Sequence, residues 1–210
     1  MRYSEMKARE NTRDWQQARE VADVVPPRRI PWTVILLLVA MGVALVACAS
    51  PQYRDTNATV TTNGPVDLER YQGLWYEIAR FPNRFEEGCV GVTAEYSLNE
   101  DGTVRVLNTC VEGTLAGPTS TAEGVATSAS PENDKLLVTF VPWLPFARGD
   151  YWILDTDYEV SVIGTPSGSV GWVLARTPTL PQDRLDAAFD VLRAAGYDTN
   201  RMTLTAQSAN

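Results

Sequence analysis

Apolar and polar residues alternate along the chain from Val66 onward, in short segments separated by turn residues. Segments of this kind, spaced at about 8–12 residues, are typical of a β-sandwich or a β-barrel. The pattern predicts an all-β domain of eight antiparallel strands, at about 73–81, 89–98, 104–109, 119–128, 135–141, 151–155, 158–164 and 170–176. Closing eight strands into an up-and-down barrel removes exposed edges and leaves room inside for one small ligand.

The period of the apolar residues changes from two to 3.6 near the carboxyl end of this domain. Pro181 suits the first turn of a helix, and Gly196 suits the position just after its end. The apolar stripe between them consists of Leu185, Ala188, Phe189 and Leu192. We therefore expect one C-terminal amphipathic helix that packs against the outside of the barrel.

The first predicted strand, Gly73-Leu74-Trp75-Tyr76-Glu77-Ile78-Ala79-Arg80, has large side chains on both faces. Trp75 and Glu77 fall on one face, whereas Tyr76 and Ile78 fall on the other. Such a strand needs packing partners on each side. Taken alone, a Gly-x-Trp segment fits an ordinary first strand of a β-domain as well as a functional motif.

An apolar segment precedes this domain. Residues 30–47 contain no charge and follow Arg28-Arg29, which is the outline of a secretory signal. Its end, Leu45-Val46-Ala47-Cys48, resembles a bacterial lipobox, in which the cysteine is acylated and becomes the first residue of the mature protein. The segment is also just long enough to span a bilayer, so a retained anchor with residues 1–29 in the cytoplasm is the alternative.

The lipobox divides the chain into three predicted parts. Residues 1–47 form a signal segment, 48–65 a lipidated cysteine with a flexible tether, and 66–210 the folded domain. A tether is expected because this stretch is rich in Thr, Asn, Pro and Gly without an apolar period. Ala49-Ser50 resemble the residues of lipoproteins sent to the outer membrane. Acyl chains contribute about 0.8 kcal/mol per buried methylene, so two or three of them hold a protein on a membrane.

The composition excludes several classes of function. The 210 residues have a net charge of −8. An acidic domain with few lysines offers no surface for phosphate backbones, so no nucleic-acid partner is expected. The chain contains no histidine. This excludes Ser-His-Asp and Cys-His catalysis and removes the commonest ligand of zinc, copper and non-haem iron, so we expect no metal and no cofactor.

Two of the three cysteines fall at the ends of one predicted hairpin. Cys89 begins the second strand and Cys110 ends the third, on either side of a turn at 99–102. Because export favours oxidation, we expect a disulfide between them. It closes a loop of about twenty residues and stabilises the fold by about 3 kcal/mol. The register of the hairpin is not perfect, so a free thiol is the alternative.

Three separated blocks resemble the lipocalin family, and within it the bacterial outer-membrane lipoproteins related to apolipoprotein D. The first block is Gly73-Leu74-Trp75-Tyr76 with its continuation to Glu86, the second is Thr156-Asp157-Tyr158, and the third is Arg176 with its neighbours. They occur in order behind the lipobox, and the likeness covers about 66–204. The resemblance implies an eight-stranded barrel that binds a ligand in its interior.

The same resemblance assigns Trp75 and Arg176 to the closed end of the barrel. In lipocalins this tryptophan forms the barrel floor and the arginine packs across it. A guanidinium on an indole face contributes about 1–2 kcal/mol when it is shielded from water. We therefore expect both residues to have a structural role rather than a catalytic one.

Alternation along the strands, together with likeness to the family, predicts which residues face the interior. They are Val92, Ala94, Tyr96, Val104, Val106, Asn108, Tyr151, Ile153, Val160, Val162, Trp172 and Leu174. Few inward positions carry charge. Glu77 is the acidic residue whose inward position the alternation leaves open. Such a lining suits a small hydrophobic ligand, a fatty acid or a lysophospholipid. The alternative is that these side chains simply fill a small barrel.

Apolar residues gather on the loops expected at the open end, which are 81–88, 141–150 and 165–169. These residues are Phe81, Phe85, Trp143, Leu144 and Phe146. Exposed Trp and Phe are costly unless they contact something. We hypothesise that the three on 141–150 contact the membrane while ligand passes, and the alternative is a lid over the mouth. The tether is expected to leave near the closed end, with enough length to turn the mouth back to the bilayer.

The sequence thus predicts a lipid-anchored carrier of small hydrophobic ligands on the periplasmic side of a bacterial outer membrane. The resemblance also suggests envelope maintenance under stress. A second hypothesis is an enzyme that acts on a bound lipid, for which only Cys89, Cys110, Tyr96 or Glu77 offers a reactive group. Without histidine an acid–base pair is hard to assemble, so we expect no enzyme. A filled barrel that acts through protein contacts is the third possibility.

Overall fold

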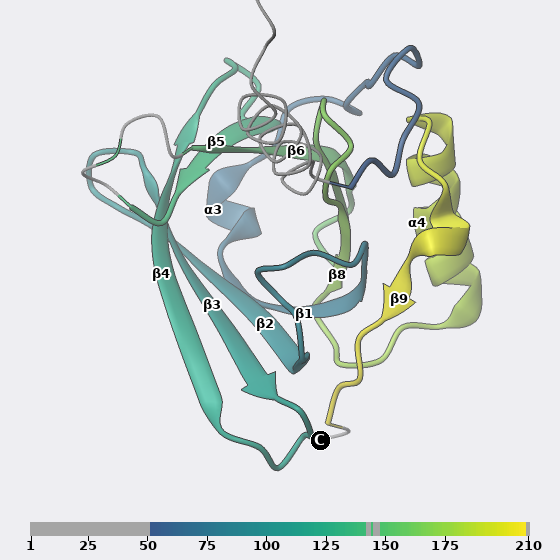
Figure 1. The fold of residues 1–210 in the computed structure, drawn as a ribbon. Helices are drawn as coiled ribbons and strands as arrows, with labels where there is room; N and C mark the ends of the chain where they lie inside the picture. Colours follow the sequence, from purple (N-terminus) through teal and green to yellow (C-terminus); the bar gives the residue numbers. More distant parts are fainter. Residues whose placement is uncertain (1–50, 142–143, 145–147, 209–210) are drawn as a thin grey trace, which may run out of the picture. The chain divides into compact units, whose positions relative to one another are not determined.

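Eight antiparallel strands close into a barrel, in which each strand pairs with its neighbour in sequence and β1 pairs with both β2 and β8 (Figure 1). The strands are β1 (Gly73–Arg80), β2 (Cys89–Leu98), β3 (Val104–Glu112), β4 (Thr119–Ser128), β5 (Lys135–Thr139), β6 (Gly149–Thr156), β7 (Val160–Gly164) and β8 (Trp172–Ala175). This computed structural model describes residues 51–141, 144 and 148–208. They belong to one unit, Ser50–Asn210. The predicted eight-stranded up-and-down barrel is confirmed.

Four short elements accompany the barrel in the described part of the chain. They are α3 (Leu68–Tyr71), α4 (Gln182–Ala194), the 3-10 helix η1 (Thr199–Arg201) and β9 (Thr203–Leu204), which pairs with the end of β1. Only α4 was predicted. Helix α3 is a single turn whose first N–H groups are capped by the side chain of Asp67, and a segment of this length is too short to show an apolar period.

Helix α4 lies where the 3.6-residue period predicts it. It begins after Pro181 and is followed by Gly196, whose φ of +87° suits a residue without a Cβ. Its buried side chains pack against the outer face of β6 and β7. The cluster that they join, called the outer core below, consists of Tyr53, Ile78, Ala79, Phe81, Leu154, Val160, Val162, Val173, Ala175, Leu185, Ala188, Leu192, Ala195 and Tyr197.

A second cluster, called the inner core below, lies inside the barrel. It consists of Val66, Tyr71, Trp75, Ala94, Tyr96, Val104, Val106, Ala126, Leu136, Ile153, Ile163 and Leu174. Strand β1 serves both clusters, since Trp75 belongs to the inner core and Ile78 to the outer core. The two apolar faces read from its sequence therefore each have their packing partners.

Strand ends differ from the prediction where local hydrogen bonds intervene. Strand β7 begins at Val160 instead of 158, because the side chain of Asp157 accepts hydrogen bonds from the N–H groups of Glu159 and Val160. Tyr158, with a φ of +71°, completes this turn. Strand β3 continues to Glu112, since its pairing with β4 extends beyond the apolar alternation.

The segment before the barrel is not a free tether over its described part. Tyr53 and Arg54 are buried. The ring of Tyr53 stacks on Phe81 with centroids 4.7 Å apart, and Arg54 donates a hydrogen bond of 2.6 Å to the carbonyl of Pro166. The prediction of a flexible tether over 49–65 is therefore wrong from residue 51. Farther along, the N–H of Asn63 donates a hydrogen bond of 3.0 Å to the carbonyl of Leu154, so the segment is attached at more than one point.

These contacts bring the start of the described chain to the open end of the barrel. Phe81 follows β1, and the loop at 165–169 joins β7 to β8; the N–H of Tyr53 donates to the carbonyl of Gly168 in that loop. The expected departure near the closed end is thus wrong. The predicted signal segment 1–47 and acylated Cys48 lie outside the described residues. Within residues 51–141, 144 and 148–208, no helix is long and apolar enough to cross a membrane.

Candidate functional site: the barrel cavity

A cavity of about 530 Å³ occupies the interior of the barrel. Its aliphatic lining consists of Val92, Ala94, Val106, Ala122, Ala126, Leu136, Val138 and Leu174. It extends to Phe85 and Glu86 in the loop after β1 and to Val170 before β8, so it reaches the open end. The side chains therefore do not fill the barrel, and a volume of this size falls in the range of small-molecule sites.

Most of the residues predicted to face the interior line this cavity. They are Val92, Ala94, Tyr96, Val106, Asn108, Tyr151, Trp172 and Leu174. Val104 and Ile153 are buried in the inner core with Trp75 and do not line the cavity. A ligand-binding role for the lining residues remains a prediction that rests on this placement.

The inward placement of Val160 and Val162 is wrong. Both belong to the outer core. The inward residues of β7 are Ser161, which contacts Tyr71, and Ile163, which belongs to the inner core. All residues of β7 are buried because α4 covers the strand from outside, so an apolar run alone does not reveal which face points inward.

The floor of the barrel has the arrangement expected from the resemblance. The guanidinium of Arg176 lies 3.9 Å from the ring centroid of the fully buried Trp75. It also donates hydrogen bonds to the carbonyls of Leu74 at 2.8 Å and Arg70 at 3.0 Å. Gly73, at a φ of +92°, passes beside this guanidinium, where an added Cβ would lie 3.5 Å from Nη1. These contacts join α3, β1 and β8 at the closed end.

Three tyrosine hydroxyls and one serine form a chain of hydrogen bonds beside the cavity. Tyr151 lies 3.0 Å from Tyr96 and 3.1 Å from Tyr71, and Tyr71 lies 2.8 Å from Ser161, all measured between hydroxyl oxygens. Burial raises the pKa of Tyr71 to about 12 and raises the pKa values of Tyr96 and Tyr151 as well. The phenols therefore stay protonated, and those of Tyr96 and Tyr151, which line the cavity, offer a ligand neutral hydroxyl groups.

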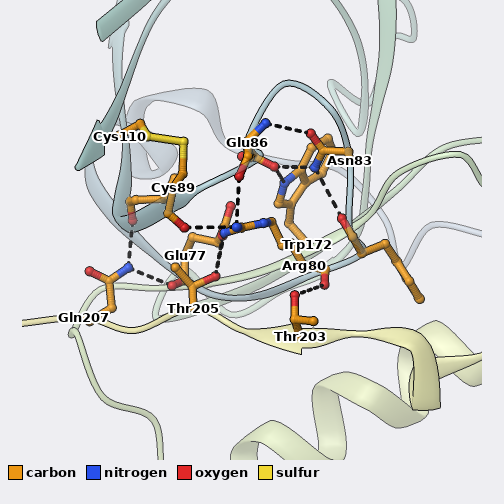
Figure 2. A network of polar contacts seen from close by, with 12 residues as sticks. Glu77, Arg80, Asn83, Glu86, Cys89, Cys110, Trp172, Thr203, Thr205 and Gln207 are labelled. Atoms are coloured by element: carbon orange, nitrogen blue, oxygen red, sulfur yellow. Dashed lines mark hydrogen bonds and ion pairs between the residues drawn. A yellow bond between two sulfur atoms is a disulfide. The ribbon is translucent and has the colours of Figure 1, made fainter. Parts of the chain in front are cut away.

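A network of charged and polar groups forms one wall of the cavity (Figure 2). Glu77 on β1 is 2% exposed and pairs with Arg80, with 2.6 Å between Oε1 and Nη1. The hydroxyl of Thr205, after β9, donates to the same carboxylate oxygen. Glu86 accepts a hydrogen bond of 3.1 Å from the indole N–H of Trp172 on β8. Figure 2 shows these side chains converging from β1, the loop that follows it, β8 and the C-terminal segment.

Burial raises the pKa of Glu77 to about 8, and the neighbouring Glu86 carboxylate adds to the rise. The hydrogen bond from Thr205 and the charge of Arg80 act in the opposite direction and only partly offset it. A buried carboxylate is costly even when paired, because both partners lose water. Near neutral pH, Glu77 is therefore largely protonated.

The predicted disulfide between Cys89 and Cys110 is confirmed. Strand pairing sets Cys89 opposite Glu112, which places Cys110 on the diagonal, and the pairing shifts between Val90 and Thr93. The two-residue offset between Glu112 and Cys110 is the imperfect register expected from the sequence. Both cysteines line the cavity, so the disulfide joins β2 to β3 at the rim of the site.

The residues predicted for the mouth have different surroundings. Phe81 is fully buried in the outer core, where it stacks on Tyr53 and Tyr197, so its placement at the mouth is wrong. Phe85 is 82% exposed and lines the cavity. Leu144 is half-buried. Trp143 and Phe146 lie outside the described residues, and their contact with a membrane remains a prediction.

Several lining residues were not predicted. Ser120, Thr121 and Ala122 on β4 line the cavity, but this strand is too weakly hydrophobic for alternation to show its inward face. Glu86 and Asp150 reach the cavity from loop and strand ends, where no period exists. In the sequence, the position of Glu77 on the first strand was the one indication that acidic residues line part of the cavity. Among the residues described, no cluster of metal-ligating side chains occurs.

Comparison with known proteins gives relatives of one kind. A family model described as a lipocalin-like domain matches residues 66–207. The chain is 41% identical to temperature-induced lipocalin-1 of Arabidopsis thaliana over 152 residues, 68% of this chain and 80% of the relative. It is 37% identical to outer membrane lipoprotein Blc of Escherichia coli K12 over 172 residues, 80% and 94% of the two chains. Identity to apolipoprotein D of Macaca fascicularis is 35% over 187 residues, 83% and 95% of the two chains.

Solved structures share the fold. Insecticyanin from the tobacco hornworm Manduca sexta has a TM-score of 0.56 at 20% identity, covering 75% of this chain and 88% of its own. Lobster apocrustacyanin A1 has a TM-score of 0.54 at 19% identity, covering 77% and 94%. At these identities the likeness concerns the fold alone.

Proposed function

Because the chain belongs to the lipocalin family, we propose that it binds and carries small hydrophobic ligands in the bacterial envelope, anchored to the outer membrane through an acylated Cys48. The similarity to an outer membrane lipoprotein of Escherichia coli supports this location. The similarity to a temperature-induced plant lipocalin agrees with envelope maintenance under stress. The expected ligands are single-chain amphiphiles of the fatty acid or lysophospholipid class.

The cavity is the observation that carries this proposal. Its volume of about 530 Å³ and its aliphatic lining suit an alkyl chain, with the polar groups at one wall and at the phenols left for a head group. Burying about ten methylenes contributes roughly 8 kcal/mol before the costs of association. Micromolar binding therefore requires no special contact beyond the apolar lining.

The attachment of the N-terminal segment supports a mouth that faces the membrane. Tyr53 is bound at the open end, and it lies five positions after Cys48 along the chain. A fully extended chain of that length spans at most about 18 Å. Three exposed apolar side chains lie on open-end segments, namely Phe85, Leu115 and Phe140. An anchor at Cys48 thus keeps the opening within reach of the bilayer.

The proposal is tested on the full chain expressed in a bacterium with an outer membrane. We expect mass spectrometry to find an acylated Cys48 as the first residue, the protein in the outer-membrane fraction, and a single-chain lipid bound to it. A Cys48→Ala variant should leave that fraction. An unacylated chain that retains residues 1–47 would contradict the anchor, and a chain that stays empty when offered lysophospholipid and fatty acid would contradict the carrier function.

The structure favours binding over the enzymatic hypothesis. Cys89 and Cys110, the two thiols with access to the cavity, are joined in a disulfide. Of the remaining candidates, Tyr96 is a buried phenol with a raised pKa, and Glu77 is held by Arg80 and Thr205. In this arrangement no described residue of the cavity is a free thiolate nucleophile.

A further inference from the structure

Acidic side chains line the cavity without a basic one among the described residues. Glu77, Glu86 and Asp150 line it, and no lysine or arginine does so among the described residues. The loop stretch 142–147, which lies partly outside the description, contains no ionisable side chain. The ionisable Asp and Glu side chains therefore make the cavity lining acidic. Alternation along the strands did not indicate this.

Arg80, the arginine of this network, uses its terminal N–H groups in hydrogen bonds within the protein. Nη1 of Arg80 donates to Glu77 at 2.6 Å and to Thr205 at 3.1 Å. Its Nη2 donates to the backbone carbonyls of Glu86 and Cys89, each at 3.0 Å. Nη1 and Nη2 of Arg80 therefore have no free N–H for an anionic ligand.

The side-chain carboxylate of Glu86 accepts hydrogen bonds from neutral groups only, within the described chain. One of its carboxylate oxygens accepts hydrogen bonds from the indole N–H of Trp172 and from the side-chain amide of Asn83. Neither Glu86 nor Asp150 takes part in an ion pair within the described chain. The cavity lining thus contains two carboxyl groups, those of Glu86 and Asp150, that have no ion-pair partner in the described chain.

An aromatic surface lies beside the carboxylate of Glu86. The ring of Trp172 lines the cavity next to Glu86 and stacks on Tyr151, with centroids 6.4 Å apart. Carboxylates together with aromatic faces favour an organic cation, because the ring quadrupole and the negative charge attract the same group. An anionic head group at this position would meet the like charge of the Glu86 carboxylate instead.

We propose that the ligand of this cavity is a single-chain amphiphile with a cationic nitrogen head group, bound beside Glu86 and Trp172, with Asp150 adding negative charge elsewhere in the same lining. The alkyl chain lies against the aliphatic lining. The proposal rests on the proposed carrier function and refines it, since it favours amine-bearing head groups and places fatty acids last among the expected ligands.

The experiment compares three dodecyl ligands that differ only in the head group. The full chain in non-ionic detergent micelles is loaded with a neutral fluorescent alkyl probe, which is displaced by dodecyltrimethylammonium, dodecanol or dodecanoate. We expect the ammonium compound to displace the probe at about tenfold lower concentration than the alcohol, and dodecanoate to be the weakest. The preference should shrink as salt is added.

Matched variants separate the wall from the net charge of the protein. Glu86→Gln with Asp150→Asn should bring the three displacement concentrations together. Glu100→Gln with Glu132→Gln removes the same charge from exposed turns at the closed end and should leave the preference intact. If the first variant fails to fold, Asp150→Asn alone, at an exposed position, should reduce the preference in part.

The outcomes distinguish this proposal from the carrier function. Equal displacement by all three ligands, or strongest displacement by dodecanoate, would overturn the cationic head group and leave a general carrier. A preference that survives Glu86→Gln with Asp150→Asn would overturn the assignment to this wall. Failure of the chain to bind the neutral probe at all would overturn the carrier function and this proposal together.

Discussion

Glu77 is a carboxyl group whose surroundings disfavour its charge. It faces Arg80 on its own strand, Glu86 in the loop after it and Thr205 in the C-terminal segment. Burial and Glu86 raise its pKa from 4.5 in the unfolded chain to about 8. Between these pH values the folded state holds a proton that the unfolded chain releases, so the contribution of Glu77 to the free energy of unfolding is fully present below pH 4.5 and is lost as pH rises toward 8.

We predict that a Glu77→Gln variant loses this pH dependence, because an amide keeps the acceptor but has no proton to release. In the wild type the free energy of unfolding should fall by up to about 1.4 kcal/mol per pH unit inside the window. Urea denaturation from pH 4.5 to 8 measures both proteins, with Glu100→Gln as the control for an exposed carboxyl. An equally steep fall in Glu77→Gln would assign the effect to other groups.

At the scale of elements, the hairpin of β2 and β3 depends on a covalent link at the cavity rim. The disulfide joins residues 21 positions apart, so reduction should lower the free energy of unfolding by about 3 kcal/mol through the greater freedom of the unfolded chain. Denaturation with and without reductant measures this loss. A double variant, Cys89→Ser with Cys110→Ser, should be equally destabilised and indifferent to reductant; a wild type that also ignores reductant would contradict the prediction.

The elements also show why the sequence predicted some positions and missed others. Trp75 and Arg176 were placed correctly because a resemblance of residues, and not a period, located them. Strand β7 was misread by one residue because α4 buries its outer face, which leaves Val160 and Ser161 equally hidden from water. Glu86 was missed because loops carry no alternation, although its carboxylate contributes to the polarity of the site.

For the molecule as a whole, the barrel was predictable but its attachment was not. Strand alternation and the apolar stripe on α4 each repeat a pattern over many residues. A prediction based on such a repeat stays correct when single residues depart from it. The segment from residue 51 to 65 shows no period, and it is attached by separate contacts along its length, among them those of Tyr53, Arg54 and Asn63. Separate long-range contacts leave no pattern in the local sequence. The sequence therefore did not correctly predict from which end of the barrel the N-terminal segment departs.

This attachment gives a prediction for ligand exchange with a membrane. A short link between Cys48 and Tyr53 keeps the open end near the bilayer, whereas a long flexible link lets the mouth turn away and dilutes it relative to the lipid surface. Inserting a Gly/Ser linker of about twelve residues between Ser50 and Pro51 should slow lipid exchange with vesicles severalfold while ligand affinity stays unchanged. The same linker inserted into the closed-end turn at 99–102 serves as the control and should leave the rate unaltered. Equal exchange rates in both insertion variants and the wild type would mean that the position of the anchor does not orient the mouth.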